Sequence, residues 1–310
     1  MSDADLPTGS QYELRHGAQR AVVTEVGATL RHYSVDGCDI VEDFPAGHMS
    51  PAGHGQVLAP WPNRLQAGSY RWEGAALQLP LSEPERGNAI HGLVRWQAWT
   101  ASARTDDGVT LSHCIHPRDG YPFLVDVRLR YALDEAGLSV SVAAANRGDR
   151  PAPFGLGFHP YLRLDDNGVD GWRLSVPADT ILVTDASGIP TGRQAAKGTP
   201  FDFRSPRPIG SVPLDTAYTD LAGGPDNLRR VEITTASSGG PSITVWMDDS
   251  FSHVMVFSGD TLGPDRRRRA LAVEPMTCPP NALASGESVI RLAPGATWSA
   301  SWGISSSASP

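Results

Sequence analysis

The chain has 310 residues, 40% hydrophobic and 19% charged, which is long enough to bury a sizeable core. Its net charge of −8 disfavours nucleic acid and anionic membrane surfaces as partners, because phosphate binding relies on an excess of Lys and Arg. No apolar run reaches the ~20 residues that cross a bilayer, and the N-terminal segment is acidic rather than signal-like, so we expect a soluble cytoplasmic monomer or homodimer.

The predicted elements are short strands. Gly (32 residues) and Pro (26 residues) recur too often for helices, and alternating or β-branched segments lie between them. The clearest segments are 20–35, 125–133, 137–146, 172–178 and 241–247. A propeller would show a repeat of ~40 residues, and the sequence has none. The pattern therefore predicts an all-β fold, a large antiparallel β-sandwich.

Two pairs of these segments are predicted to form antiparallel hairpins, over residues 125–146 and 243–257, because a short polar turn separates two alternating runs. No interior stretch has the composition of a linker. We therefore expect a single domain over residues 1–310, with flexible tails at 1–9 and 304–310.

Several motifs that suggest metal or anion sites are discounted. Residues 165–171 lack the spacing of a calcium loop, and His113 and His116 point to opposite faces of a strand, which argues against zinc. The basic run at 265–271 is interpreted as a solvated loop that could also meet a phosphate. The widely spaced cysteines suggest neither a disulfide framework nor a thiolate metal site, and we expect them to be reduced: Cys38, Cys114 and Cys278.

Five segments place single polar side chains among Gly, Pro and aromatic residues, as ligand-contacting loops on a β scaffold often do: 58–74, 88–96, 153–164, 213–221 and 270–283. Each side chain also has a structural interpretation. Arg64 could be a surface ion-pair partner, His91 and His159 loop or core histidines, Asp215 a turn cap and Glu274 a solvated strand end. A partly desolvated Glu274 would have a raised pKa that suits a general base.

Taken together, these side chains form an ordered set that resembles the aldose 1-epimerase (galactose mutarotase) family. The set is Asn63-Arg64, Asn88-x-x-His91-Gly92, Gly157-x-His159-Pro160-Tyr161, Asp215 and Glu274-Pro275. The likeness runs from about residue 10 to 303, and residues 27–44 look like the family's opening hairpin. The resemblance implies a galactose mutarotase-like supersandwich that binds a monosaccharide on an open concave face, with no metal and no organic cofactor.

The resemblance also implies roles. Glu274 matches the family's base, which takes the proton from the C1 hydroxyl, and His159 matches the acid, which as an imidazolium protonates the ring oxygen O5. His91 matches a histidine that hydrogen-bonds O5 or a neighbouring hydroxyl. The remaining candidates would bind the sugar or form a wall of the site against its apolar face: Arg64, Asp215, Asn63, Tyr161, Trp61 and Trp96.

The chain departs from the family around these groups. It has His91-Gly92-Leu93 where the family typically has His-Gly-Gly, Phe158-His159-Pro160-Tyr161-Leu162 in place of Asn-His-x-Tyr-Phe, and Glu274-Pro275-Met276 in place of Glu-Pro-Gln. Galactose or glucose is the default substrate, and another aldose stays open.

Three alternatives remain. A hexose-6-phosphate 1-epimerase would need further basic groups, for which Arg95 and the 266–269 run are candidates. A non-catalytic carbohydrate-binding protein of the same fold would be expected to lack the acid or the base. An unrelated β-sandwich lectin predicts that His159 and Glu274 lie more than ~10 Å apart, out of hydrogen-bonding reach of one sugar ring.

Overall fold

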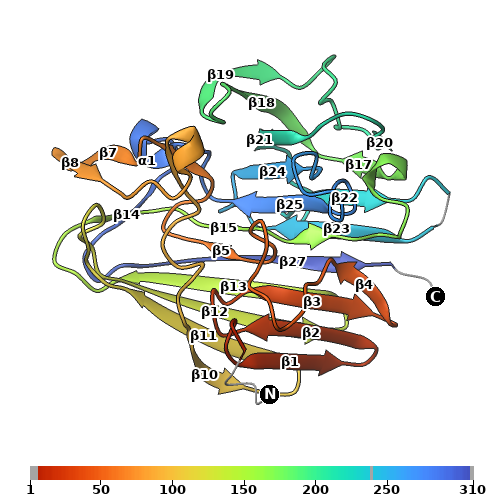
Figure 1. Ribbon diagram of the computed structural model, residues 1–310, viewed down its shortest axis with the longest axis horizontal. Coiled ribbons are helices and arrows are strands. Elements are labelled where there is room, and N and C mark those ends of the chain that lie inside the picture. The colour runs from red at the N-terminus through yellow and green to blue at the C-terminus, as the bar shows by residue number, and fades with distance from the viewer. Residues whose placement is uncertain (1–5, 238–239, 308–310) are drawn as a thin grey trace.

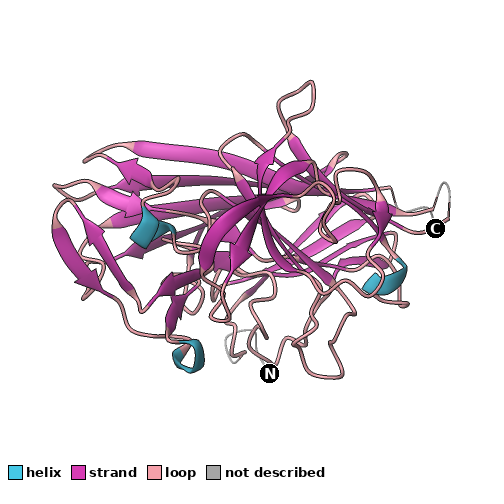
Figure 2. Cartoon of the chain, turned by 90° about the horizontal axis from the view of Figure 1, so that it is seen from above, coloured by secondary structure: helices cyan, strands magenta, loops and turns pink. Residues whose placement is uncertain are grey.

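Nearly all regular structure in the chain is extended, which confirms the all-β prediction. The structure, a computed structural model, describes residues 6–237 and 240–307. Figure 2 shows strands throughout the molecule, and the helices within the described ranges are all short: η2 (Pro84–Arg86), η3 (Val169–Gly171) and α1 (Ala282–Ser285). None of the helices in the described ranges has the length and apolar character of a membrane span.

The larger sheet has 12 strands, in the order β1-β2-β3-β4-β16-β25-β24-β21-β18-β19, with β15 joining β25 to β5. Its strands are β1 (Gln11–His16), β2 (Gln19–Thr24), β3 (Leu30–Val35), β4 (Cys38–Val41), β5 (Val57–Leu58), β15 (Gly157–Phe158), β16 (Tyr161–Leu162), β18 (Ala178–Thr184), β19 (Pro190–Ala195), β21 (Asp215–Leu221), β24 (His253–Phe257) and β25 (Leu271–Met276).

The second sheet has nine strands, in the order β10-β11-β12-β13-β27-β23-β22-β17-β20. Its strands are β10 (Thr100–Arg104), β11 (Gly108–Ile115), β12 (Val125–Asp134), β13 (Gly137–Asn146), β17 (Arg173–Ser175), β20 (Arg207–Pro208), β22 (Arg229–Thr234), β23 (Ser242–Met247) and β27 (Thr297–Ser306). Three small pairs complete the fold: β6 (Arg64–Gln66) with β9 (Asn88–Ile90), β7 (Ser69–Trp72) with β8 (Ala75–Gln78), and β14 (Ala152–Phe154) with β26 (Ile290–Leu292).

The core lies between the two large sheets because their strands alternate. Along β12 every second side chain from Val125 to Leu133 is buried, while Arg128 and Arg130 between them are exposed. Strands β1 and β2 lie against β11 and β12 (Figure 1). The buried Tyr131 donates a hydrogen bond across this layer to the carbonyl of Ala28, at 2.8 Å.

The hairpin predicted over 125–146 is confirmed as β12 and β13, which pair antiparallel from Val125–Asn146 to Asp134–Gly137. Residues 27–44 contain a hairpin, formed by β3 and β4. It follows an earlier hairpin, β1–β2, and is therefore not the first in the chain.

The hairpin predicted over 243–257 is wrong. Strand β23 pairs in the nine-stranded sheet and β24 in the 12-stranded sheet, so the turn between them passes from one sheet to the other. Asp248 holds this turn to β27, because its carboxylate accepts hydrogen bonds from the backbone N–H groups of Ser301 at 2.5 Å and Ser250 at 3.0 Å.

Parts of the predicted flexible tails have strand structure or are buried. Residues 304–306 belong to β27, and Thr8 is buried. Residues 1–5 and 308–310 lie outside the described residues.

Candidate active site

A pocket of about 340 Å³ opens beside the middle of the 12-stranded sheet, close to the size of sites that bind small molecules. It collects side chains from β6, β9, β16, β21 and β25 and the loops beside them. Among the residues that line it are all but one of the predicted site residues and sugar walls: Asn63, Arg64, His91, Trp96, His159, Tyr161, Asp215 and Glu274.

Strand register brings the predicted acid and base together. Gly157 is opposite Met276 and Tyr161 is opposite Ala272 on β25, and continuing either pairing by two residues places His159 opposite Glu274. Residues directly opposite on one face of a sheet have neighbouring side chains. The His159 Nε2 atom accordingly lies 3.3 Å from the Glu274 Oε1 atom, which is the proximity that the unrelated lectin alternative does not predict.

Burial sets the protonation of this pair. Both side chains are almost fully buried, and desolvation penalises the charged form of each. Burial, with His54 nearby, lowers the pKa of His159 to about 3. Burial and the Asp215 charge raise the pKa of Glu274 well above its ordinary value. The pair therefore has ion-pair geometry, while burial favours the neutral form of each group, a Glu274 carboxylic acid beside a neutral His159 imidazole. The imidazolium expected from the resemblance is disfavoured there.

Buried polar atoms around the pair have no hydrogen-bond partner within the described chain. They are Nδ1 of His159, Nδ1 of His91 and Oε2 of Glu274. Buried polar groups in proteins are nearly always paired, so unpaired ones inside a pocket indicate groups that a polar ligand satisfies.

His159 is positioned by a stack of rings that the sequence did not reveal. The Tyr161 ring stacks on His54 at 3.6 Å and on His159 at 4.9 Å between centroids. His54 is fixed in turn, because its Nε2 atom lies 2.7 Å from the Glu42 carboxylate and its Nδ1 atom 2.6 Å from the Pro51 carbonyl. Tyr161 thus packs its ring against histidines and donates its hydroxyl to the Ala52 carbonyl, which suits positioning better than a sugar platform.

The opposite wall comes from β6 and β9. His91 follows β9 in the left-handed region, at φ 62°, and its backbone N–H donates to the Asn63 carbonyl at 2.9 Å. A non-glycine residue in this region is strained, a feature that clusters at functional sites. Burial lowers the pKa of His91 well below its ordinary value, so its imidazole is neutral.

Arg64 is held by an acidic side chain that sequence reasoning missed. Its Nε and Nη2 atoms donate to the two oxygens of Glu83 at 2.8 and 3.0 Å, a bidentate pair that fixes the guanidinium plane. Asn88 supports Glu83 at 3.2 Å, which gives this motif residue a supporting position behind the pocket. Asp215 lies exposed at the pocket rim, at the start of β21.

The predicted aromatic walls separate into two outcomes. Trp61 is 2% exposed and packs in the core, so its assignment as a sugar wall is wrong: the apolar segment that contains it is an interior one. Trp96 lines the pocket and is 46% exposed. In the sequence, the glycines on either side of His54 could have pointed to the ring stack that was missed. Nothing in the residues next to Glu83 marks it as the partner of Arg64.

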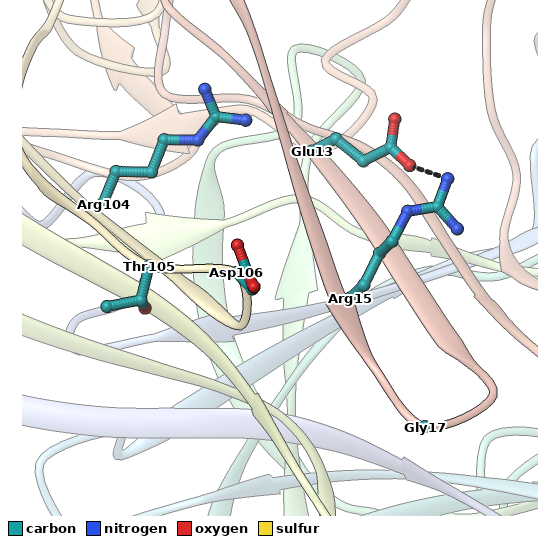
Figure 3. A pocket seen from close by; sticks show the side chains of 6 residues that line it. All are labelled: Glu13, Arg15, Gly17, Arg104, Thr105 and Asp106. Carbon is teal, nitrogen blue, oxygen red and sulfur yellow. Dashed lines mark ion pairs between the residues drawn. The ribbon is translucent and has the colours of Figure 1, made fainter.

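The basic run is only partly the solvated loop that was expected, because the Arg268 side chain is 15% exposed and the Arg266 Nη1 atom lies 3.4 Å from the His54 Nε2 atom. No residue of the basic run 265–269 is among those lining this pocket, and Arg268 forms ion pairs with Asp170 at 2.6 Å and Asp260 at 2.8 Å. No cluster of metal-binding side chains occurs in residues 6–237 and 240–307. A further hollow of about 700 Å³ is lined by Glu13, Arg15 and Gly17 on one side and by the segment from Arg104 to Asp106 on the other, and Glu13 and Arg15 are ion-paired (Figure 3). Its described lining has no histidine.

The fold and this site define a mutarotase-like protein, and sequence comparison agrees. The sequence profile described as aldose 1-epimerase matches residues 10–305, so the chain belongs to the aldose 1-epimerase family. It is 34% identical over 294 residues to YihR of Escherichia coli K12, a protein described as uncharacterized, covering 93% of this chain and 90% of that one.

Solved structures share the fold. A GalM/aldose epimerase homologue from C. elegans superposes with a TM-score of 0.86 at 18% identity, covering 97% of this chain and 99% of that one. A galactose 1-epimerase from Lactobacillus acidophilus gives a TM-score of 0.78 at 21% identity, covering 95% and 93%. These likenesses confirm a galactose mutarotase-like fold.

Proposed function

We propose that this protein is an aldose 1-epimerase that interconverts the α and β anomers of an aldohexose such as galactose or glucose. The observation that carries the proposal is the His159–Glu274 pair, with its atoms 3.3 Å apart and further polar atoms unpaired beside it in a pocket of monosaccharide size. Anomer exchange needs one acid and one base within reach of O5 and O1, and this pair supplies both.

The chemistry requires only one transferable proton on the pair. Burial favours that proton on Glu274, and anomer exchange begins from the form in which it has passed to His159. Glu274 then accepts the O1 proton while the C1–O5 bond breaks. The electrons of the O1–H bond form the C1=O1 carbonyl, and the C1–O5 electrons stay on O5, which takes the proton from His159. After rotation about C1–C2 the steps reverse on the other carbonyl face. The neutral pair that burial favours is the form present with the open-chain aldehyde.

The remaining residues orient the sugar. The Arg64 guanidinium, fixed by Glu83, offers its free N–H groups to hydroxyls, and the Asp215 carboxylate accepts from them. The neutral His91 lies with its ring 5.5 Å from that of His159 and hydrogen-bonds O5 or an adjacent hydroxyl. Asn63 contributes by holding the backbone of Arg64, whose N–H donates to its side chain at 2.8 Å.

The test is polarimetry of freshly dissolved α-D-galactose and α-D-glucose. We expect wild-type protein to accelerate mutarotation, and Glu274→Gln and His159→Asn each to lower kcat by about 10²- to 10⁴-fold, the usual contribution of general acid–base catalysis. Glu232→Gln and His116→Asn, which lie outside the pocket lining, serve as matched controls. Wild-type protein that binds an aldose without accelerating its mutarotation would instead support the non-catalytic carbohydrate-binding alternative.

A further inference from the structure

His54 is buried between two groups that accept hydrogen bonds. Its side chain is 1% exposed, its Nε2 atom lies 2.7 Å from the Glu42 carboxylate, and its Nδ1 atom lies 2.6 Å from the Pro51 carbonyl. A carboxylate and a carbonyl have no hydrogen to donate, so both ring nitrogens must carry one for both hydrogen bonds to form. The two partners therefore define His54 as an imidazolium, a fixed positive charge that the Glu42 carboxylate balances.

The Tyr161 ring joins this cation to His159. The His54 and Tyr161 rings are 5° from parallel with centroids 3.6 Å apart, and the Tyr161 and His159 rings are 10° from parallel at 4.9 Å. The Tyr161 hydroxyl donates to the Ala52 carbonyl at 3.1 Å, which fixes the middle ring of the stack. A displacement of His54 is therefore passed to His159 through a ring that contacts both.

The backbone beside His54 holds His159 as well. The Gly55 N–H donates to the His159 carbonyl at 2.8 Å, and the His159 N–H donates to the Gln56 carbonyl at 3.1 Å. Gly53 packs against the imidazole itself, since a Cβ atom placed there would lie 2.9 Å from the His159 Cδ2 atom. Residues 53–56 thus contact both the backbone and the ring of His159, and the His54–Glu42 pair fixes these residues to the end of β4.

The charge of His54 acts on the reacting pair. Among the charges around His159, that of His54 has the largest effect, and with burial it lowers the pKa of His159 to about 3. A second proton on the His159–Glu274 pair would place like charges on either side of Tyr161, which the His54 charge opposes. That doubly protonated pair would have no base for the O1 proton. The other titratable and charged groups that face the stack are Glu42, His91, Arg95, Asp215, Arg266 and Glu274.

We propose that His54 is a positioning residue of the epimerase: held as an imidazolium by Glu42, it fixes the His159 ring through Tyr161 and keeps the reacting pair to a single proton. The inference rests on the proposed function, which needs one transferable proton on that pair and His159 within reach of O5. His54 is not among the residues that line the pocket, so it acts without touching the sugar. Its ring supplies the position and its charge sets the proton count, which substitution can separate.

The first experiment compares His54→Ala with His54→Phe, using whichever of α-D-galactose and α-D-glucose the wild type exchanges faster. At pH 7, His54→Ala should lower kcat by about 10- to 100-fold and change KM by less than about threefold, because the reacting imidazole is misplaced. His54→Phe keeps a ring on Tyr161 and should recover kcat to within about fivefold of the wild type. On acidification, His54→Phe should lose activity about one pH unit above the wild type, because the charge that opposes the second proton is gone.

The second experiment is NMR of the ring nitrogens in histidine-labelled protein, with His54→Phe identifying the His54 signals. At pH 7 both nitrogens of His54 should be protonated in the wild type. Glu42→Gln keeps an oxygen that accepts a hydrogen bond but removes the counter-charge. It should therefore leave His54 neutral and move the acidic loss of activity to higher pH, as His54→Phe does. The spectrum needs no substrate, so it separates the state of His54 from the proposed function, which fails if wild-type protein exchanges neither sugar.

His32 provides the matched controls, because it is also a buried histidine of the 12-stranded sheet, with the Asp39 and Asp43 carboxylates 3.8 and 3.7 Å from its Nδ1 atom, and is not among the residues that line the pocket. His32→Ala and His32→Phe should keep kcat within about threefold and lose activity at the wild-type pH. Circular dichroism at each pH verifies folding, and if His54→Ala does not fold, His54→Phe, Glu42→Gln and the spectrum still decide. The inference is overturned if folded His54→Ala keeps the wild-type kcat, if His54→Phe loses activity at the same pH as the wild type, or if only one nitrogen of His54 is protonated at pH 7.

Discussion

At the scale of single residues, the position of the His159 ring depends on a glycine. Gly53 has φ +82°, and a Cβ atom placed on it would lie 2.9 Å from the His159 Cδ2 atom, closer than real contacts allow. The Tyr161 ring stacks on the same imidazole. Gly53 and Tyr161 therefore confine His159 where it lies opposite Glu274, and neither needs to touch the sugar's reacting atoms.

Gly53→Ala should consequently lower mutarotase activity more than stability. The added methyl displaces the imidazole from Glu274, and misplacement of a reacting group by about 1 Å costs up to 10²-fold in rate. The matched control is Gly74→Ala. Gly74 has a similar φ of +84°, but no atom lies within 4 Å of the point where an added Cβ would lie. Both variants should lose about 1–2 kcal/mol of folding free energy from backbone strain. Equal kcat values in the two variants would contradict the role given to Gly53.

The residue scale is also where sequence reasoning was most and least informative. Isolated polar residues among Gly, Pro and aromatics marked Arg64, His159 and Glu274 as candidates, because loops on β scaffolds present such side chains, and the ordered resemblance to the aldose 1-epimerase family supplied their expected roles. Trp61 could not be distinguished from Trp96 in this way, since burial of an aromatic residue depends on which sheet face its loop covers. The protonation state of His159 could not be predicted from the sequence either, because desolvation of a side chain is a property of the folded pocket.

At the scale of elements, strand pairing explains both a success and a failure of prediction. The β12–β13 hairpin followed from alternation and a short polar turn, which are local features. The same features precede and follow Asp248, yet its neighbouring strands enter different sheets. What decides the outcome is non-local: the Asp248 side chain and backbone N–H both bond to Ser301 on β27.

Asp248→Ala should therefore destabilise the fold. It leaves the N–H groups of Ser301 and Ser250 without their carboxylate acceptor. A hydrogen bond to a charged group contributes about 1.5–3 kcal/mol when it is shielded from solvent, and less when it is not. We expect a loss of about 1–3 kcal/mol, measured as a lower midpoint of urea unfolding with an unchanged m-value. Its exposed neighbour provides the comparison: Asp249→Ala should change stability by less than about 0.5 kcal/mol. Similar midpoints for the two variants would exclude the anchoring role.

At the scale of the whole molecule, the fold buries several histidines as neutral side chains. Burial lowers the pKa of His253 to about 4, outside the pocket, in addition to its effects on His91 and His159. Below pH 6.5 the unfolded chain binds protons at these histidines that the folded chain does not, so their contribution to stability falls as pH falls. Glu274 acts in the opposite direction, because its raised pKa makes the folded state bind its proton more tightly above pH 4.5.

His253 isolates this effect from catalysis because it does not line the pocket. Its Nδ1 atom lies 2.8 Å from the Ser252 hydroxyl, and its Nε2 atom lies 3.4 Å from the Glu287 carboxylate. With a folded pKa of about 4, its contribution is lost as pH falls from 6.5 toward 4. In His253→Gln the free energy of unfolding should therefore depend less steeply on pH in that window, by up to about 1.4 kcal/mol per pH unit. Urea unfolding at half-unit pH steps gives the slope, and a slope equal to that of the wild type would mean that His253 takes up its proton equally well in the folded chain.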